Sequence, residues 1–162
     1  MRQDRFLIGI LVGIAVLVIA AVALFFMRRG TLEYGPESAP DGVVRNYIVA
    51  IKKGDFERAY GYLGDFKNKP SQLAFRQGFL NYQASQIAST GIEVGSASIE
   101  GDKAVVQITL LEGGGGLFND MYRNTQSADL SLVNGQWKIT NMAFPFWNYG
   151  WSEPNKYAPA AP

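Results

Sequence analysis

Residues 43–63, VVRNYIVAIKKGDFERAYGYL, contain the pattern that decides the fold. Their first half predicts a helix that begins near Pro40 and stops at Gly54, because apolar residues recur on one face at helical spacing. Those residues are Val43, Val44, Tyr47, Ile48 and Ile51. Asp55 then suits the N-cap of a second helix, which Gly64 ends. The stretch therefore predicts two short helices separated by a tight break.

The sequence after this stretch predicts one more helix and then a sheet. Ser71 is the candidate N-cap of a helix that extends to about Ile87, although Gly78 weakens one unbroken helix. β-Branched residues then predict strands at residues 92–99, 104–111, 127–133 and 136–142. Asn134-Gly135 is a favoured hairpin dipeptide. Three helices followed by an antiparallel meander predict an α+β domain with the helices on one face of a curved sheet.

The composition excludes several classes of chemistry. The 162 residues include neither cysteine nor histidine, which rules out disulfides, thiolate metal sites, cysteine nucleophiles and histidine bases. The net charge is +1 and no block of basic residues occurs, so no nucleic-acid partner is expected. No metal or other cofactor is expected either, since no spaced acidic loop of the calcium-binding type is present.

Residues 6–27, FLIGILVGIAVLVIAAVALFFM, carry no charge and predict a transmembrane helix. The alternative is a cleaved signal peptide with Ala21-Val22-Ala23 at the cleavage site, but the apolar run is longer than a signal peptide needs. The expected anchor includes Phe6, Gly9, Gly13, Phe25 and Phe26, with the two glycines at the spacing of a helix-packing motif.

The flanking charges decide little about orientation. Arg2 and Arg5 precede the apolar run, and Arg28 and Arg29 follow it. We expect a single-pass protein of the bacterial cytoplasmic membrane with its domain on the outer, periplasmic or extracellular, face. The expected division is an anchor at 1–29, a linker at 30–39, the α+β domain at 40–144 and an aromatic, proline-rich tail at 145–162.

Two stretches resemble the nuclear transport factor two-like superfamily. Residues 43–63 are similar to its first two helices, which a short break with Gly and Asp separates. Residues 127–144, SADLSLVNGQWKITNMAF, are similar to its last hairpin. The resemblance spans residues 39–144 and implies a cone-shaped domain with a pocket between a long helix and a concave sheet. The superfamily includes ketosteroid-isomerase-type enzymes as well as dimerisation and scaffold domains, so fold alone does not assign a function.

An enzyme is the least favoured interpretation. Ketosteroid-isomerase chemistry needs a carboxylate base and a tyrosine in an apolar site. Asp55, Asp129, Tyr47 and Tyr60 are chemically eligible, but none matches that family's catalytic positions. Helix capping, core packing and solvent exposure explain them more simply. We therefore expect no catalytic residues.

A ligand-binding domain is the second interpretation. Four aromatic side chains are candidates for lining an apolar pocket: Tyr47, Tyr60, Phe79 and Trp137. The alternative is that these rings fill the cone and leave no cavity.

The favoured interpretation is a non-catalytic accessory or scaffold subunit of a membrane complex. Its expected partners are the lipid bilayer, other membrane protein subunits or a second copy of the chain. Pro145 cannot continue a strand, so the aromatic side chains after it are predicted to lie outside the core. We expect them to contact a partner protein or lipid headgroups: Phe146, Trp147, Tyr149 and Trp151.

Overall fold

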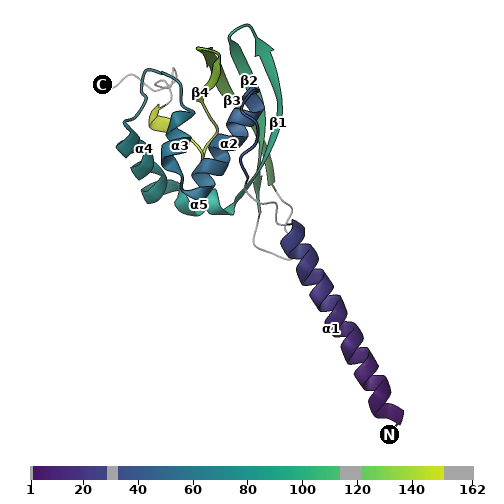
Figure 1. The fold of residues 1–162 in the computed structure, drawn as a ribbon. Coiled ribbons are helices and arrows are strands. Elements are labelled where there is room, and N and C mark those ends of the chain that lie inside the picture. Colours follow the sequence, from purple (N-terminus) through teal and green to yellow (C-terminus); the bar gives the residue numbers. More distant parts are fainter. Residues whose placement is uncertain (1, 29–32, 114–121, 152–162) are drawn as a thin grey trace. The chain divides into compact units, whose positions relative to one another are not determined.

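The chain divides into two compact units, Met1–Leu32 and Glu33–Pro162. A computed structural model describes residues 2–28, 33–113 and 122–151 (Figure 1). The first unit contains one helix, α1 (Arg2–Arg28). The second contains a sheet and all other described helices.

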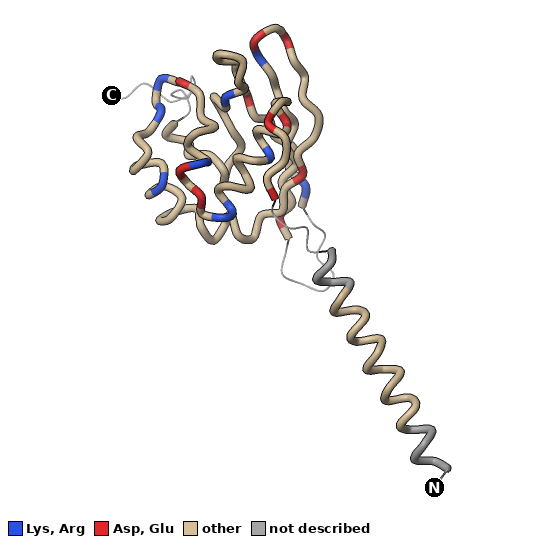
Figure 2. Tube along the Cα trace, in the orientation of Figure 1, with Lys and Arg blue, Asp and Glu red and all other residues tan. Residues whose placement is uncertain are grey.

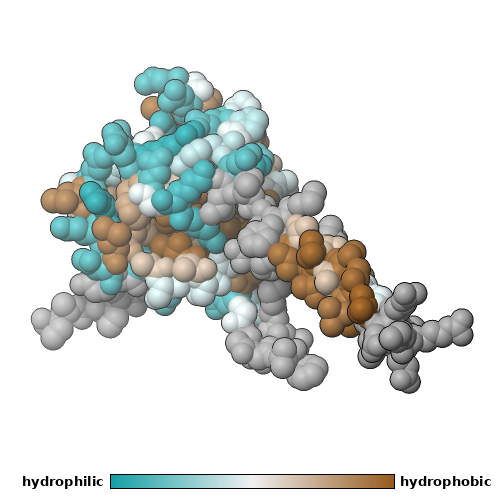
Figure 3. Space-filling view, turned by 60° about the horizontal axis from the view of Figure 1, so that its bottom comes forward, coloured by the Kyte–Doolittle hydropathy of each residue, from teal (hydrophilic) through white to brown (hydrophobic). Residues whose placement is uncertain are grey.

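The described part of α1 is apolar but does not meet the requirement for crossing a membrane. Its large apolar side chains are exposed, and the face of α1 seen in Figure 3 is mostly apolar. Among the residues described, no helix is both long and apolar enough to span a bilayer.

This finding contradicts the predicted transmembrane helix at residues 6–27, and with it the single-pass anchor and the outer-face location. The side chains of Phe6, Phe25 and Phe26 lie outside the described set. Gly9 and Gly13 have open space where a Cβ atom would stand. The predicted small-residue packing face therefore has no described neighbour.

The first two helices of the domain form as predicted. α2 (Pro40–Lys53) stops at Gly54, which has the left-handed φ of 74° and donates its N–H to the carbonyl of Ile51 at 3.0 Å. α3 (Phe56–Gly61) begins at Asp55, whose carboxylate accepts the Arg58 N–H at 3.2 Å. The short break between the helices thus lies where the sequence placed it.

The predicted third helix is divided at Gly78. α4 (Gln72–Gly78) starts at Ser71, whose hydroxyl accepts the Ala74 N–H. A π-helix, η1 (Phe79–Gln83), and a further helix, α5 (Ala84–Ser89), follow without a break in the chain. The π-helix changes which residues face inward, so Gln83 is buried at its end.

The sheet is a four-stranded antiparallel meander in the order β1-β2-β3-β4. Its strands are β1 (Thr90–Glu100), β2 (Lys103–Glu112), β3 (Tyr122–Val133) and β4 (Gln136–Asn141). Asn134 and Gly135 both have positive φ at the β3–β4 turn, and the register of β1 shifts between Val94 and Ala97, next to Gly95. The helices lie on one side of the sheet (Figure 1). The predicted α+β class is confirmed.

The core lies between α2 and the sheet. β2 alternates between buried and more exposed positions, and its buried residues are Ala104, Val106, Ile108 and Leu110. These residues belong to one cluster with the apolar face of α2. Charged residues of both signs are interspersed over the domain surface and do not separate into two faces (Figure 2).

The segment after Pro145 also belongs to the core, which corrects the prediction that its rings lie outside it. Phe146 is 0% exposed and Trp147 is 2% exposed. The Tyr47 hydroxyl donates to the carbonyl of Phe146 at 2.7 Å, and Gln83 Nε2 donates to the carbonyl of Trp147 at 2.8 Å. β4 already ends at Asn141, before Pro145, and donors from α2 and η1 hold the chain that follows inside the core.

The last two predicted interface rings behave differently. Trp151, in the 3-10 turn η2 (Tyr149–Trp151), is half-buried against the core, whereas Tyr149 is 74% exposed. Residues 152–162, the rest of the predicted tail, lie outside the described residues.

Candidate functional site

The predicted ring pocket contains packed side chains. Tyr47, Tyr60 and Phe79 each contact Phe75, with ring centroids 6.4, 5.5 and 4.9 Å from its own. Tyr47 and Phe79 are buried and Tyr60 is half-buried. Burial raises the pKa of Tyr47 well above its ordinary value, and its hydroxyl is already engaged with Phe146. This packing agrees with the alternative in which the rings fill the interior.

Trp137 is not part of that ring cluster. It lines a groove of about 430 Å³ beside the β3–β4 turn, together with residues of α3 and of the segment before α2. The sequence grouped Trp137 with the three other rings because all four suit an inward face. The structure brings only Tyr47, Tyr60 and Phe79 together.

The carboxylates considered for catalysis have structural partners. Asp55 caps α3 and accepts the Tyr34 hydroxyl at 3.0 Å. Asp129 accepts the side-chain amide of Asn141 at 3.1 Å. In the parts of the chain that the structure describes, no three acidic side chains gather in a way that would hold a metal ion.

Glu37 is the centre of a polar cluster beside the groove that Trp137 lines. Its Oε1 accepts from the Tyr62 hydroxyl at 2.7 Å, from the Arg58 guanidinium at 2.9 Å and from the Asn46 amide at 3.2 Å. The hydrogen bond from Tyr62 is the main reason that the pKa of Glu37 is lowered, and the bonds from Arg58 and Asn46 add to it. The charged groups of this cluster are therefore engaged with one another.

The same cluster fixes the segment that leads into α2. The buried side chain of Asn46 accepts the Gly35 N–H and donates to the Gly35 carbonyl, both at 2.8 Å. A Cβ atom on Gly42 would lie 2.2 Å from the carbonyl oxygen of Pro36. Residues expected to form a linker thus pack closely on α2 through specific contacts.

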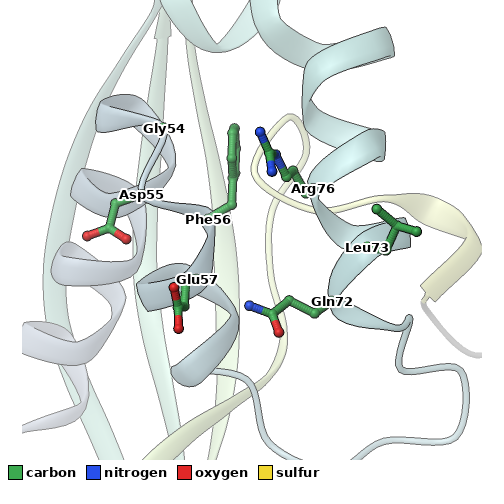
Figure 4. Close-up of a pocket in the computed structure, with 7 residues that line it drawn as sticks. All are labelled: Gly54, Asp55, Phe56, Glu57, Gln72, Leu73 and Arg76. Carbon is green, nitrogen blue, oxygen red and sulfur yellow. The ribbon is translucent and has the colours of Figure 1, made fainter.

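A second surface groove lies between α3 and α4 and has a volume of about 550 Å³ (Figure 4). We call it the α3–α4 groove. Its lining residues are Gly54, Asp55, Phe56, Glu57, Gln72, Leu73 and Arg76. In Figure 4, Gln72 and Glu57 point toward one another across the groove, and Arg76 lies beside Phe56. The groove therefore combines an aromatic ring, one cation and two carboxylates.

Three of its polar side chains are unengaged. Glu57, Gln72 and Arg76 make no hydrogen bond or ion pair with the described residues. Leu73 is 64% exposed at the same site. The ring of Phe56 packs against the core, because it stacks on Phe79 with centroids 6.0 Å apart and planes 10° apart. The groove thus has a fixed aromatic wall and free polar groups in front of it.

The sequence did not identify this site. Glu57, Gln72 and Arg76 are ordinary surface residues of short helices, and a ten-residue connection separates α3 from α4. Only the packing of α3 beside α4 places the four side chains in one groove.

No protein-family model matches the chain, and no curated protein matches it. Among solved structures, the chain is similar to a SEC-C motif containing protein from Rhodopseudomonas palustris. The identity is 13% and the TM-score 0.45, with 66% of this chain and 79% of that one covered. It is also similar to an NTF2-like protein with a cystatin-like fold from Novosphingobium aromaticivorans, with 14% identity, a TM-score of 0.43 and coverage of 75% and 82%.

A third similar structure is the "putative NTF2-like transpeptidase" from Campylobacter jejuni. The identity is 16% and the TM-score 0.44, with 62% of this chain and 95% of that one covered. NTF2-like and cystatin-fold proteins are thus among the neighbours. All three TM-scores lie below 0.5, so the description of the fold rests on the elements of this chain, and these proteins supply no argument about function.

Proposed function

We propose that the domain is a non-catalytic binding domain that takes a short zwitterionic peptide with apolar side chains in the α3–α4 groove. The observation that carries this proposal is the set of unengaged polar groups, Glu57, Gln72 and Arg76, in front of a fixed aromatic ring. Small-molecule sites commonly combine apolar walls with a few convergent polar groups.

The ligand class follows from the chemistry of the groove. The planar guanidinium of Arg76 suits a carboxylate, which it can bind through two parallel hydrogen bonds. Glu57 suits an ammonium group, and the amide of Gln72 can donate or accept. Phe56 and Leu73 offer apolar surface for a side chain. Figure 4 shows the cation and the anion at different places along the groove, which suits a ligand with separated charges.

The size of the groove also favours a peptide of two or three residues. Its volume of about 550 Å³ lies within the range of about 300–1,000 Å³ that is typical of small-molecule sites. A dipeptide has about 20 non-hydrogen atoms. At about 0.3 kcal/mol per atom, its expected Kd is on the order of tens of micromolar.

Calorimetric titration of the full-length chain with L-leucyl-L-phenylalanine tests the proposal. Arg76→Gln is expected to weaken binding by about three- to tenfold, since an exposed ion pair contributes up to about 1 kcal/mol and the bidentate geometry adds to it. The matched control is Arg45→Gln, because Arg45 is exposed on α2 and lines none of the grooves described above. It should bind as the unmodified chain does.

The same peptide with an acetylated N-terminus and an amidated C-terminus separates charge recognition from apolar contact. It keeps both side chains but has neither charge, so it should bind at least about threefold more weakly. Equal affinity for the two peptides, or equal effects of Arg76→Gln and Arg45→Gln, would contradict the proposal.

The role of accessory subunit in a larger assembly stays a prediction. Exposed Tyr149 is the one ring of the predicted interface that is left on the surface of the described domain. The absence of catalysis is likewise part of the proposal. It is supported by the structural engagement of Asp55, Asp129 and Tyr47.

A further inference from the structure

We infer that the position now held by the indole of Trp151 is a binding site for a planar aromatic ligand of indole size, which enters when Trp151 leaves. The site is formed by Phe75, Gly78, Phe79 and Trp147, and we call it the aromatic seat. It is separate from the α3–α4 groove, so this inference does not depend on the proposed function.

The seat is built for a flat ring. Trp151 stacks on Phe75, with centroids 5.3 Å apart and planes 23° apart. Phe79 and Trp147 meet it edge-on, with centroids at 5.8 and 5.5 Å. One stacked and two edge-on contacts follow the preferences of the aromatic quadrupole. Three rings from α4, η1 and the C-terminal segment therefore define both the plane and the edges of the occupant.

Gly78 completes the seat by lacking a side chain. A Cβ atom on Gly78 would already be in van der Waals contact with Cζ2 of Trp151, at 3.5 Å, so the further atoms of a branched side chain would compete for the space of the ring. Gly78 is also the last residue of α4, immediately before the π-helix. π-Helical turns within helices occur frequently at functional sites.

Trp151 is attached less firmly than the rings around it. It is half-buried, whereas Phe75, Phe79 and Trp147 are 0%, 1% and 2% exposed. Its backbone is held by one hydrogen bond within the described residues, from its N–H to the carbonyl of Asn148 at 2.9 Å, in a turn of three residues. Phe75, Phe79 and Trp147 therefore stay in place when the η2 turn opens and Trp151 moves out. The site is then already formed, and Trp151 competes with the ligand for it.

Two buried polar atoms beside the seat indicate that the cluster can take a further group. Gln83 Oε1 and Trp147 Nε1 have no hydrogen-bond partner among the described residues, although the other end of the Gln83 amide is bound to the Trp147 carbonyl. Buried polar side-chain atoms are usually paired, so such atoms call for an explanation. A heteroaromatic ligand can supply a hydrogen-bonding group as well as a plane.

Fluorine NMR of the full-length chain labelled with 5-fluorotryptophan tests the inference directly. The chain has three tryptophans, which single replacements assign. Titration with indole should shift the Trp151 signal toward that of a solvent-exposed tryptophan and leave the Trp137 signal in place. A Trp151 signal that does not move at saturating indole would overturn the inference, and this experiment needs no variant to fold.

Two substitutions add an independent measurement. Trp151→Ala removes the indole ring that fills the seat. This variant should bind free indole at least about tenfold more tightly than the unmodified chain, because the seat is then vacant in every molecule. Adding Gly78→Val should cancel that binding, whereas Gly61→Val, at a glycine with open space around it, should not. Equal indole affinity of Trp151→Ala and the unmodified chain, or equal effects of the two valines, would overturn the inference.

Discussion

Replacement of Trp147 by alanine tests whether the segment after Pro145 is core. Trp147 is 2% exposed, and its ring meets those of Phe66 and Trp151 with centroids 5.1 and 5.5 Å away. A buried tryptophan removes up to about 250 Å² from water, worth about 6 kcal/mol at most, and measured Trp→Ala changes are about 3–5 kcal/mol. The substitution also removes the buried, unpaired Nε1 donor, which destabilises the folded state, and this reduces the expected loss of stability by about 1 kcal/mol.

We therefore expect Trp147→Ala to lower the free energy of unfolding by about 2–4 kcal/mol, and the Tm by about 7–16 °C. Urea and thermal unfolding of the full-length chain, followed by near-ultraviolet circular dichroism, measure both. Tyr149→Ala is the control, because Tyr149 is 74% exposed and should change stability by less than about 0.5 kcal/mol. If Trp147→Ala changes stability as little as Tyr149→Ala does, the segment is not core and the reasoning is wrong.

Three further predictions concern the segment before α2. Asn46→Ala should destabilise the domain by about 1–3 kcal/mol in urea unfolding, because it leaves the Gly35 N–H and C=O without their partner; a change below about 0.5 kcal/mol would contradict this. Gly42→Ala should destabilise measurably and Gly61→Ala should not, since a Cβ atom would lie 2.2 Å from the Pro36 carbonyl oxygen at the first position and meets nothing at the second. The folded-state pKa of Glu37 is lowered, so Glu37 stabilises the folded state above its ordinary pKa of 4.5, and this stabilisation is lost as the pH falls through the folded-state pKa. Glu37→Gln should therefore make the decrease of Tm below about pH 4.5 less steep. An unchanged dependence of Tm on acid pH would refute that role.

Local signals in the sequence were sufficient for most of the fold. Gly54 and Asp55 set the break between α2 and α3, and Asn134-Gly135 set the β3–β4 turn, because each acts through its own backbone conformation or its own cap. β-Branched residues likewise predicted a strand at residues 104–111, within β2. These features depend on neighbours within a few positions, which the sequence displays.

Features that depend on distant partners were not predictable in this way. The absence of a strand after Pro145 was predicted, but the carbonyl of buried Phe146 is held by the hydroxyl of Tyr47, 99 positions earlier. The interpretation of residues 30–39 as a linker missed the amide of Asn46, which holds Gly35. The α3–α4 groove was missed because its polar residues have no pattern of their own and converge only through packing.

The side-chain Nε–Hε NMR signal of Arg76, followed during titration with L-leucyl-L-phenylalanine, tests the central claim most directly. The account predicts that this signal shifts with the same saturation curve as the calorimetric titration, because the guanidinium donates hydrogen bonds to the peptide carboxylate. The signal of Arg45 should stay in place. Binding of the peptide with no change at Arg76, or with equal changes at Arg76 and Arg45, would contradict the assignment of the α3–α4 groove as the binding site.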